Sequence, residues 1–327
     1  MSALPPDIVD PPTPEAPAEV EDAAAAGGAK RPGLGVIGWL SAAWLILVAL
    51  VAILAPVLPV DDPTQPVRGL ARQGLMSDGH ILGGDALGRD VLSRLVFGAR
   101  SSLLVGVGSV LLGLVVGGTL GLISGFRRGR ADTFLSSLFD ILLAFPQLVL
   151  ALSLVAFLRP DPGQGSGAAA ATGGAAAEVP KSGLTTIQIL IIALGVVAIP
   201  LLARITRATT LSWAQREFVL AARAQGAKNA RLMVREVLPN VLPAMFSIAL
   251  LGVGVAIIAE GGLSILGVGI ELPTPSWGNM IAENRNVRNA PTNALFSPIV
   301  AVFLTLMALN YLGDAVRRKF DVRDSAL

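Results

Sequence analysis

Six long apolar runs divide this chain, and no other feature limits its fold as strongly. Each is about 20 residues or longer, which is the length that a helix rising ~1.5 Å per residue needs to cross a ~30 Å hydrocarbon layer. Backbone polar groups in lipid must pair within the protein, so we predict an all-α integral membrane protein with six transmembrane helices. The runs are about Leu34 to Leu58, Ser101 to Phe126, Thr133 to Leu158, Leu184 to Ala203, Val241 to Ile270 and Asn293 to Leu312.

Composition excludes most enzyme classes. The chain is 53% hydrophobic and 15% charged, far more apolar than a soluble domain of 327 residues. It has no cysteine, and its single histidine, His80, cannot build a metal site alone, so we expect no metal. There is no G-x4-GK[ST] phosphate loop, no G-x-S-x-G elbow and no HExxH pair. We therefore expect no catalytic residues and no cofactor bound by this chain.

The distribution of basic residues predicts the orientation in the membrane. Six spans place both chain ends on one side, and short cytoplasmic loops carry an excess of Lys and Arg. Of the 25 Lys and Arg residues, sixteen fall on the side that holds both tails, the 127–130 turn and the 204–235 loop, and nine on the other. We therefore expect a multi-pass protein of the cell membrane with both termini in the cytoplasm.

A polar, Arg-rich segment between two apolar runs, REFVLAARAQGAKNARLMVREVLPN at 216–240, favours two short helices around a glycine. Its alanines favour helix and present little bulk, which suits docking. Gly226 can adopt the positive φ that ends a helix, and Asn229 can cap the next one. Pro239 removes a backbone donor, so we expect the second helix to stop at Leu238 to Asn240.

The spacing AA-x3-G, with Leu-Pro ending thirteen residues after the glycine, resembles the EAA loop of ABC-importer permeases. In that family the loop is a cytoplasmic coupling helix that inserts into a separate ATPase subunit. The glutamate that names the motif would fall at Leu220, with Glu217 the nearest acid. The alternative is an ordinary amphipathic loop helix. The resemblance assigns ATPase coupling to Glu217, Phe218, Ala221, Ala222, Arg223, Gly226, Ala227, Leu238 and Pro239.

The polar insert at 59–100 contains LGGDALGRDVLSRLVFGAR, in which Leu87, Val91 and Leu95 recur at helical spacing. This spacing predicts an amphipathic helix lying on the membrane surface. The string is similar to the LGTDxLGRDxxSRxxxGAR signature of C-type peptide-importer permeases, with Gly84 in place of threonine. Its charged residues either form an ion-pair network at the outer mouth or a merely solvated face. They are Asp85, Arg89, Asp90, Arg94 and Arg100.

A stripe of small residues runs along the second apolar run at four-residue steps: Ser109, Gly113, Gly117, Gly121 and Gly125. Small residues let helix backbones approach closely in lipid, where packing drives association. The neighbouring glycines superficially resemble a dinucleotide loop, but no strand precedes them and the surroundings are apolar. We therefore predict helix packing.

Acidic residues inside apolar runs are costly and mark a translocation path or a buried ion pair. Glu260, in AIIAEGGLSILGVG, is expected to have a buried structural partner such as a basic residue, with substrate contact as the alternative. Asp140, which precedes the family-like LLAFP string, and Asp314 are expected to form ion pairs or to lie at helix ends. Asp314 is spaced for pairing with Arg317 and Arg318.

These expectations divide the chain into five parts. Residues 1–33 hold six acids against Lys30 and Arg31 and are expected to be a disordered cytoplasmic tail. Residues 34–58 form the first transmembrane helix, and 59–100 an extracytoplasmic insert with the amphipathic helix. Residues 101–315 form a five-helix permease core that includes the 216–240 loop and a flexible Gly/Ala-rich loop at 159–183. Residues 316–327 are a cytoplasmic tail.

The resemblance covers about residues 34–320 and identifies the chain as a C-type permease subunit of a dipeptide or oligopeptide ABC importer, with the type I importer permease fold. It implies a homologous B-type permease, one or two ATPase subunits carrying ATP and Mg, an extracytoplasmic peptide-binding protein and surrounding lipid as partners. No nucleic-acid partner is implied. Alternatives are a permease of a nickel or small-solute importer and, in another class, an ion channel or proton-coupled carrier.

Overall fold

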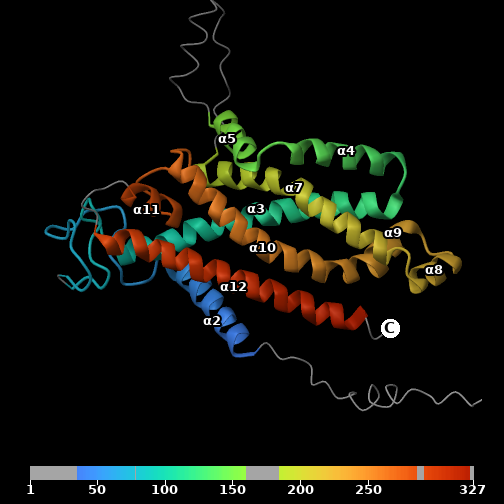
Figure 1. The fold of residues 1–327 in the computed structure, drawn as a ribbon, viewed down its shortest axis with the longest axis horizontal. Coiled ribbons are helices and arrows are strands. Elements are labelled where there is room, and N and C mark those ends of the chain that lie inside the picture. The colour runs from blue at the N-terminus through green and yellow to red at the C-terminus, as the bar shows by residue number, and fades with distance from the viewer. Residues whose placement is uncertain (1–34, 78, 160–183, 286–290, 325–327) are drawn as a thin grey trace, which may run out of the picture.

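The computed structural model describes residues 35–77, 79–159, 184–285 and 291–324, and its ordered elements are helices, without a β-strand in those ranges (Figure 1). The acidic tail at 1–33 and nearly all of the loop at 159–183 lie outside the described residues. The all-α prediction is therefore confirmed for the part of the chain that can be described.

Five helices are long and apolar enough to cross a membrane, and a broken pair brings the number to as many as six. The chain is thus a multi-pass membrane protein. The five are α2 (Gly35–Leu54), α3 (Val91–Arg127), α7 (Thr186–Trp213), α10 (Leu238–Ile265) and α12 (Thr292–Asp324).

The third apolar run is not the continuous helix that the sequence predicts. It forms α4 (Arg130–Ala144) and α5 (Gln147–Leu158), which meet at an angle of 93° between their described parts. Phe145 adopts an extended conformation because the ring of the following Pro146 disfavours the helical region for the residue before it. The LLAFP string therefore marks a break, and α5, drawn above α7 in Figure 1, packs against α7 and also contacts α10.

The prediction of a surface helix in the insert is also wrong. Leu87 lies in a turn, and the helix begins at Val91 and continues as α3 into the second span. Asp90 is the N-cap, and its carboxylate accepts a 2.7 Å hydrogen bond from the Ser93 N–H. The capping bond and the positive φ of Gly88 (+83°) separate the turn from the helix, so the two do not form one amphipathic surface.

The predicted glycine stripe of α3 lies against α7. A Cβ atom built on Gly117 would be 2.5 Å from the Ile199 carbonyl oxygen, and one on Gly121 would be 2.3 Å from that of Ala203. Only hydrogen fits at these positions, so the two helices pack backbone to backbone. On the opposite flank α10 and α12 follow α3, with α2 outermost (Figure 1).

One short helix lies between the last two spans. The helix α11 (Trp277–Asn284) begins with a capping box between Ser276 and Asn279 and buries Trp277. The helix α12 continues past Leu312, the end of the last apolar run, to Asp324. The Gly313 carbonyl accepts a 2.7 Å hydrogen bond from Ser247 of α10, so this glycine permits close contact between the two helices.

Candidate functional site

The predicted docking segment forms a compact hairpin at one end of the bundle, with α8 (Glu217–Ala224) at its tip (Figure 1). Gly226 has φ +85°, and the Ala227 N–H donates to the Ala222 carbonyl at 3.2 Å, which is the Schellman closure of a helix end. The prediction that Gly226 ends this helix is confirmed. The prediction that Asn229 caps the next helix is wrong by one residue, because Lys228 occupies the N-cap without a side-chain bond.

Pro239 does not stop the second helix of the hairpin. The short α9 (Asn229–Arg231) leads into a π-helical turn, η1 (Leu232–Val237), and then directly into α10. A π-turn shifts the hydrogen-bond ladder by one residue, and Pro239 follows in the first turn of α10, where a missing N–H is tolerated. The hairpin is therefore continuous with a membrane-spanning helix rather than hinged to it.

A small apolar core holds α8 to the bundle. Val219 is completely buried together with Leu232, Val237 and Val241, and Leu122 of α3 belongs to the same cluster. Burying a side chain of this size contributes about 1.5–3 kcal/mol, so the helix is firmly attached. We call this cluster the hairpin core.

The hairpin core divides the predicted docking residues into two groups. Ala222 is half-buried and packs on the core, as do Ala227 and Leu238. The other predicted coupling residues are exposed, and Phe218 is more than two-fifths accessible, as is its neighbour Leu220, which is not among the predicted residues. The exposed coupling residues are Glu217, Phe218, Ala221, Arg223, Gly226 and Pro239. The exposed face thus combines an apolar side chain, small residues and both an acid and a base, and its exposed Phe and Arg are residue types enriched where proteins bind one another.

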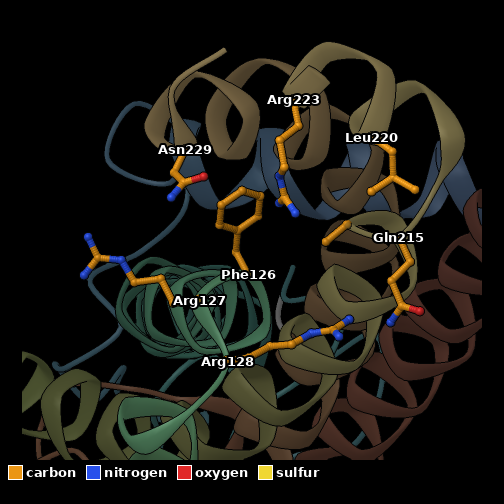
Figure 2. A pocket seen from close by; sticks show the side chains of 8 residues that line it. Phe126, Arg127, Arg128, Gln215, Leu220, Arg223 and Asn229 are labelled. Atoms are coloured by element: carbon orange, nitrogen blue, oxygen red, sulfur yellow. The ribbon is translucent and has the colours of Figure 1, made fainter. Parts of the chain in front are cut away.

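A basic pocket of about 670 Å³ lies between α8 and the end of α3 (Figure 2). Arg223 extends from α8 toward Phe126, with its guanidinium 5.9 Å from the ring centroid, a cation–π distance. The lining residues of the pocket include three arginines and no acid, so the pocket favours binding of an anionic group. They are Phe126, Arg127, Arg128, Ala214, Gln215, Leu220, Arg223 and Asn229. The sequence indicated the basic turn at 127–130 but not its position beside α8.

The insert and α11 share a charged cluster at the other end of the bundle. Asp85 accepts from the Arg89 Nε at 2.7 Å, and Arg94, only 1% exposed, reaches both Asp85 and Glu283. Glu283, on α11, also binds Arg89 at 3.1 Å. Glu283 is not among the predicted site residues; it is 189 positions from Arg94, and no local sequence pattern indicates that pairing.

Two of the predicted network residues lie outside this cluster. Asp90 caps α3 and contacts His80 instead. Arg100 is exposed on α3 and forms no ion pair within the described ranges. The charged face of the insert is therefore neither one continuous network nor merely solvated. It is a compact group of two arginines and two carboxylates that joins the insert to α11.

Glu260 is completely buried, but its partners are hydroxyls rather than the expected basic residue. Its carboxylate accepts hydrogen bonds from Ser276 (2.8 Å), Ser264 (2.9 Å) and Ser102 (3.3 Å). The Trp277 N–H donates in turn to the Ser102 hydroxyl at 3.1 Å. Glu260 thus connects α3, α10 and the start of α11.

The other two acids lie nearer the surface of the bundle. Asp140 of α4 pairs with Arg204 of α7, and both side chains are 58% exposed. Asp314 is exposed on α12, and its pairing with Arg317 or Arg318 stays a prediction. An apolar hollow of about 480 Å³ between α3, α5, α7 and α10 is lined by neighbours of Glu260, including Ala259, but not by Glu260 itself.

Known proteins match this chain over most of its length. Residues 117–323 match the model of the family described as binding-protein-dependent transport system inner membrane component. The dipeptide transport system permease protein DppC of Alkalihalophilus pseudofirmus is 33% identical over 293 residues, covering 89% of this chain and 86% of that protein. The di/tripeptide transport system permease protein DppC of Pseudomonas aeruginosa is 35% identical, covering 88% of each.

Two further similarities concern cargo and fold. The glutathione transport system permease protein GsiD of Pectobacterium atrosepticum is 34% identical and covers 75% of this chain and 73% of that protein. A structure of the inward-facing MetNI methionine ABC transporter has a TM-score of 0.54 at 18% identity, covering 70% of this chain and 97% of that one. At this identity the likeness shows the fold alone, that of type I ABC importer permeases.

Proposed function

This chain belongs to the family of binding-protein-dependent transport system inner membrane components, and we propose that it forms half of the translocation path of an ATP-driven importer of dipeptides or oligopeptides. The named relatives support a short-peptide cargo, because dipeptides, di/tripeptides and glutathione, itself a tripeptide, appear in their names. This favours peptides over nickel or another small solute. A homologous B-type permease would supply the other half of the path.

The observation that carries the coupling role is the continuity between α8 and the spans. Val219 of α8 is buried with Leu232 and Val237 of η1, which runs without a break into α10. A force applied to the exposed face of α8 is therefore transmitted to α10, the helix that bears Glu260. Separate ATPase subunits would engage that face and the basic pocket beside it. Coupling then requires that ATP-bound and nucleotide-free ATPases favour different permease conformations.

The proposed path uses the apolar hollow between α3, α5, α7 and α10. The 93° break between α4 and α5 places α5 at its edge, against α7. In alternating access this hollow would open first toward the peptide-binding protein outside and then toward the cytoplasm. We assign structural roles rather than substrate contact to two acids of the spans, since Glu260 is enclosed by serines and Asp140 pairs with Arg204.

The proposed orientation places both termini and α8 in the cytoplasm. The 127–130 turn, the α8 hairpin and the end of α12 lie together at one end of the bundle, and the insert and α11 lie at the other (Figure 1). The basic loops that are dispersed in the sequence thus share one end. This agreement with the positive-inside rule supports the assignment.

Because the chain has no cysteine, single-cysteine variants give a direct test. Ala221→Cys, on the exposed face of α8, is expected to cross-link to an ATPase subunit and to resist membrane-impermeant thiol reagents added to intact cells. Leu75→Cys, exposed in the insert, is the matched control and is expected to show the opposite pattern. Labelling of Ala221→Cys from outside, or peptide uptake by this chain without ATPase subunits, would refute the proposal.

A further inference from the structure

The insert brings the single histidine of the chain together with two aspartates from separate segments. The His80 Nδ1 lies 3.1 Å from an Asp90 carboxylate oxygen and 3.4 Å from one of Asp61. The three donor atoms lie within 4.8 Å of one another. Asp61 follows α2 and Asp90 caps α3, so the group joins the two ends of the insert.

The charges of this group are not balanced by a permanent cation. Asp61 and Asp90 have no Lys or Arg partner within 4.0 Å in the described ranges, whereas Arg89 and Arg94 are paired with Asp85 and Glu283. A neutral imidazole carries one proton. If Nδ1 bears this proton, it can donate a full hydrogen bond to only one of the two carboxylates. If Nε2 bears the proton, the Nδ1 lone pair faces two anionic oxygens.

A divalent cation resolves this conflict. Zn²⁺ binds His nitrogen and carboxylate oxygen at about 2.0–2.2 Å, so donor atoms on adjacent coordination positions lie roughly 3.0–3.5 Å apart. The distances from the His80 Nδ1 to the Asp90 and Asp61 oxygens, 3.1 and 3.4 Å, fall in this range. Two carboxylates and a neutral imidazole also compensate a charge of two. The mixed donor set favours a borderline transition ion over Ca²⁺ or Mg²⁺, which prefer oxygen alone.

We propose that Asp61, His80 and Asp90 bind a first-row transition-metal ion of the Zn²⁺ type, completed by water on the exposed side of Asp61. Asp90 is held for this role, because its second carboxylate oxygen accepts the Ser93 N–H at 2.7 Å. The Ser93 hydroxyl in turn donates to the Asp61 carbonyl. The ion would fasten the beginning of the insert to the start of α3. This site is independent of the proposed transport function.

The test is Zn²⁺ binding by the full-length chain in detergent, free of any polyhistidine tag and pretreated with a chelator. Calorimetric titration should give one Zn²⁺ per chain and no comparable heat with Ca²⁺. His80→Gln and Asp61→Asn should each weaken binding by at least about tenfold. Zn²⁺ should also raise the melting temperature of the wild type but not of His80→Gln.

Asp62→Asn is the matched control. Asp62 is adjacent and exposed, and its carboxylate accepts hydrogen bonds from Thr64, which lower its pKa, rather than joining the cluster. This variant should bind Zn²⁺ like the wild type. Absence of Zn²⁺ binding by the wild type would overturn the proposal. The imidazole alone would then bridge the two carboxylates. Equal affinity in His80→Gln would also overturn the proposal, because an adventitious surface site would then be the binder.

Discussion

The hydroxyl of Ser276 donates a 2.8 Å hydrogen bond to the buried carboxylate of Glu260, and it also accepts the Asn279 N–H at 3.0 Å as the N-cap of α11. One side chain thus ties a membrane-spanning helix to the short helix outside it. Ser264 and Ser102 complete the arrangement around the carboxylate. Glu260 therefore resembles a structural junction more than a substrate ligand.

Glu260→Leu should lower the stability of the assembled permease by about 3 kcal/mol, because three buried hydroxyls lose their acceptor. Glu260→Gln keeps one acceptor oxygen and should retain most peptide uptake. Thermal unfolding and ATP-driven uptake measure the two effects, with the exposed Glu271→Gln as the control. If Glu260→Gln abolishes uptake without changing the melting temperature, the charge itself serves transport.

Gly117→Ala should destabilise the bundle by about 1–3 kcal/mol, since the new Cβ would be 2.5 Å from the Ile199 carbonyl oxygen and the helices would have to separate. Gly117→Leu should lower the stability of the bundle further, because its side chain is larger. The matched control is Gly262→Ala, where the new Cβ would lie 3.6 Å from the nearest atom of a neighbouring helix, the Leu148 Cδ2. Equal melting temperatures for Gly117→Ala, Gly262→Ala and the wild type would contradict the packing described for α3 and α7.

Glu283→Gln should destabilise the end of the bundle that holds α11 by about 3 kcal/mol, because the buried guanidinium of Arg94 would keep only the Asp85 carboxylate, at 3.5 Å. The free energy of unfolding can be followed by denaturant titration. Glu271→Gln again serves for comparison, since Glu271 is 65% exposed and its contact with Arg159 is 3.6 Å. A Glu283→Gln variant no less stable than Glu271→Gln would show that this ion cluster contributes little.

Ala221→Trp and Ala222→Trp should fail for different reasons. Ala221 is exposed, so its variant should fold normally but lose peptide-stimulated ATP hydrolysis when combined with ATPase subunits. Ala222 packs on the hairpin core, so its variant should lose about 1–3 kcal/mol of stability. Melting temperature and ATPase rate separate the two outcomes. Normal coupled ATPase activity in Ala221→Trp would argue against docking through this face.

Sequence reasoning succeeded where the physical constraint is local. Apolar run length placed five of the spans, and the positive φ of Gly226 ended α8 as the spacing suggested. It failed where two local signals compete. Pro146 breaks the third span because the preceding residue must leave the helical region, whereas Pro239 lies in the first turn of α10, where a missing N–H is tolerated, and breaks nothing.

By itself, the sequence determined that this chain is a helical membrane protein and a member of a permease family, because hydrophobic run length and short motifs are properties of consecutive residues. Only the tertiary structure decided which charges meet. Glu283 joins Arg94, three serines enclose Glu260, and Asp61 reaches His80, although these partners are far apart along the chain or unrelated by any periodicity. Buried polar groups must find partners wherever the packed helices supply them, and that supply is set by packing in three dimensions.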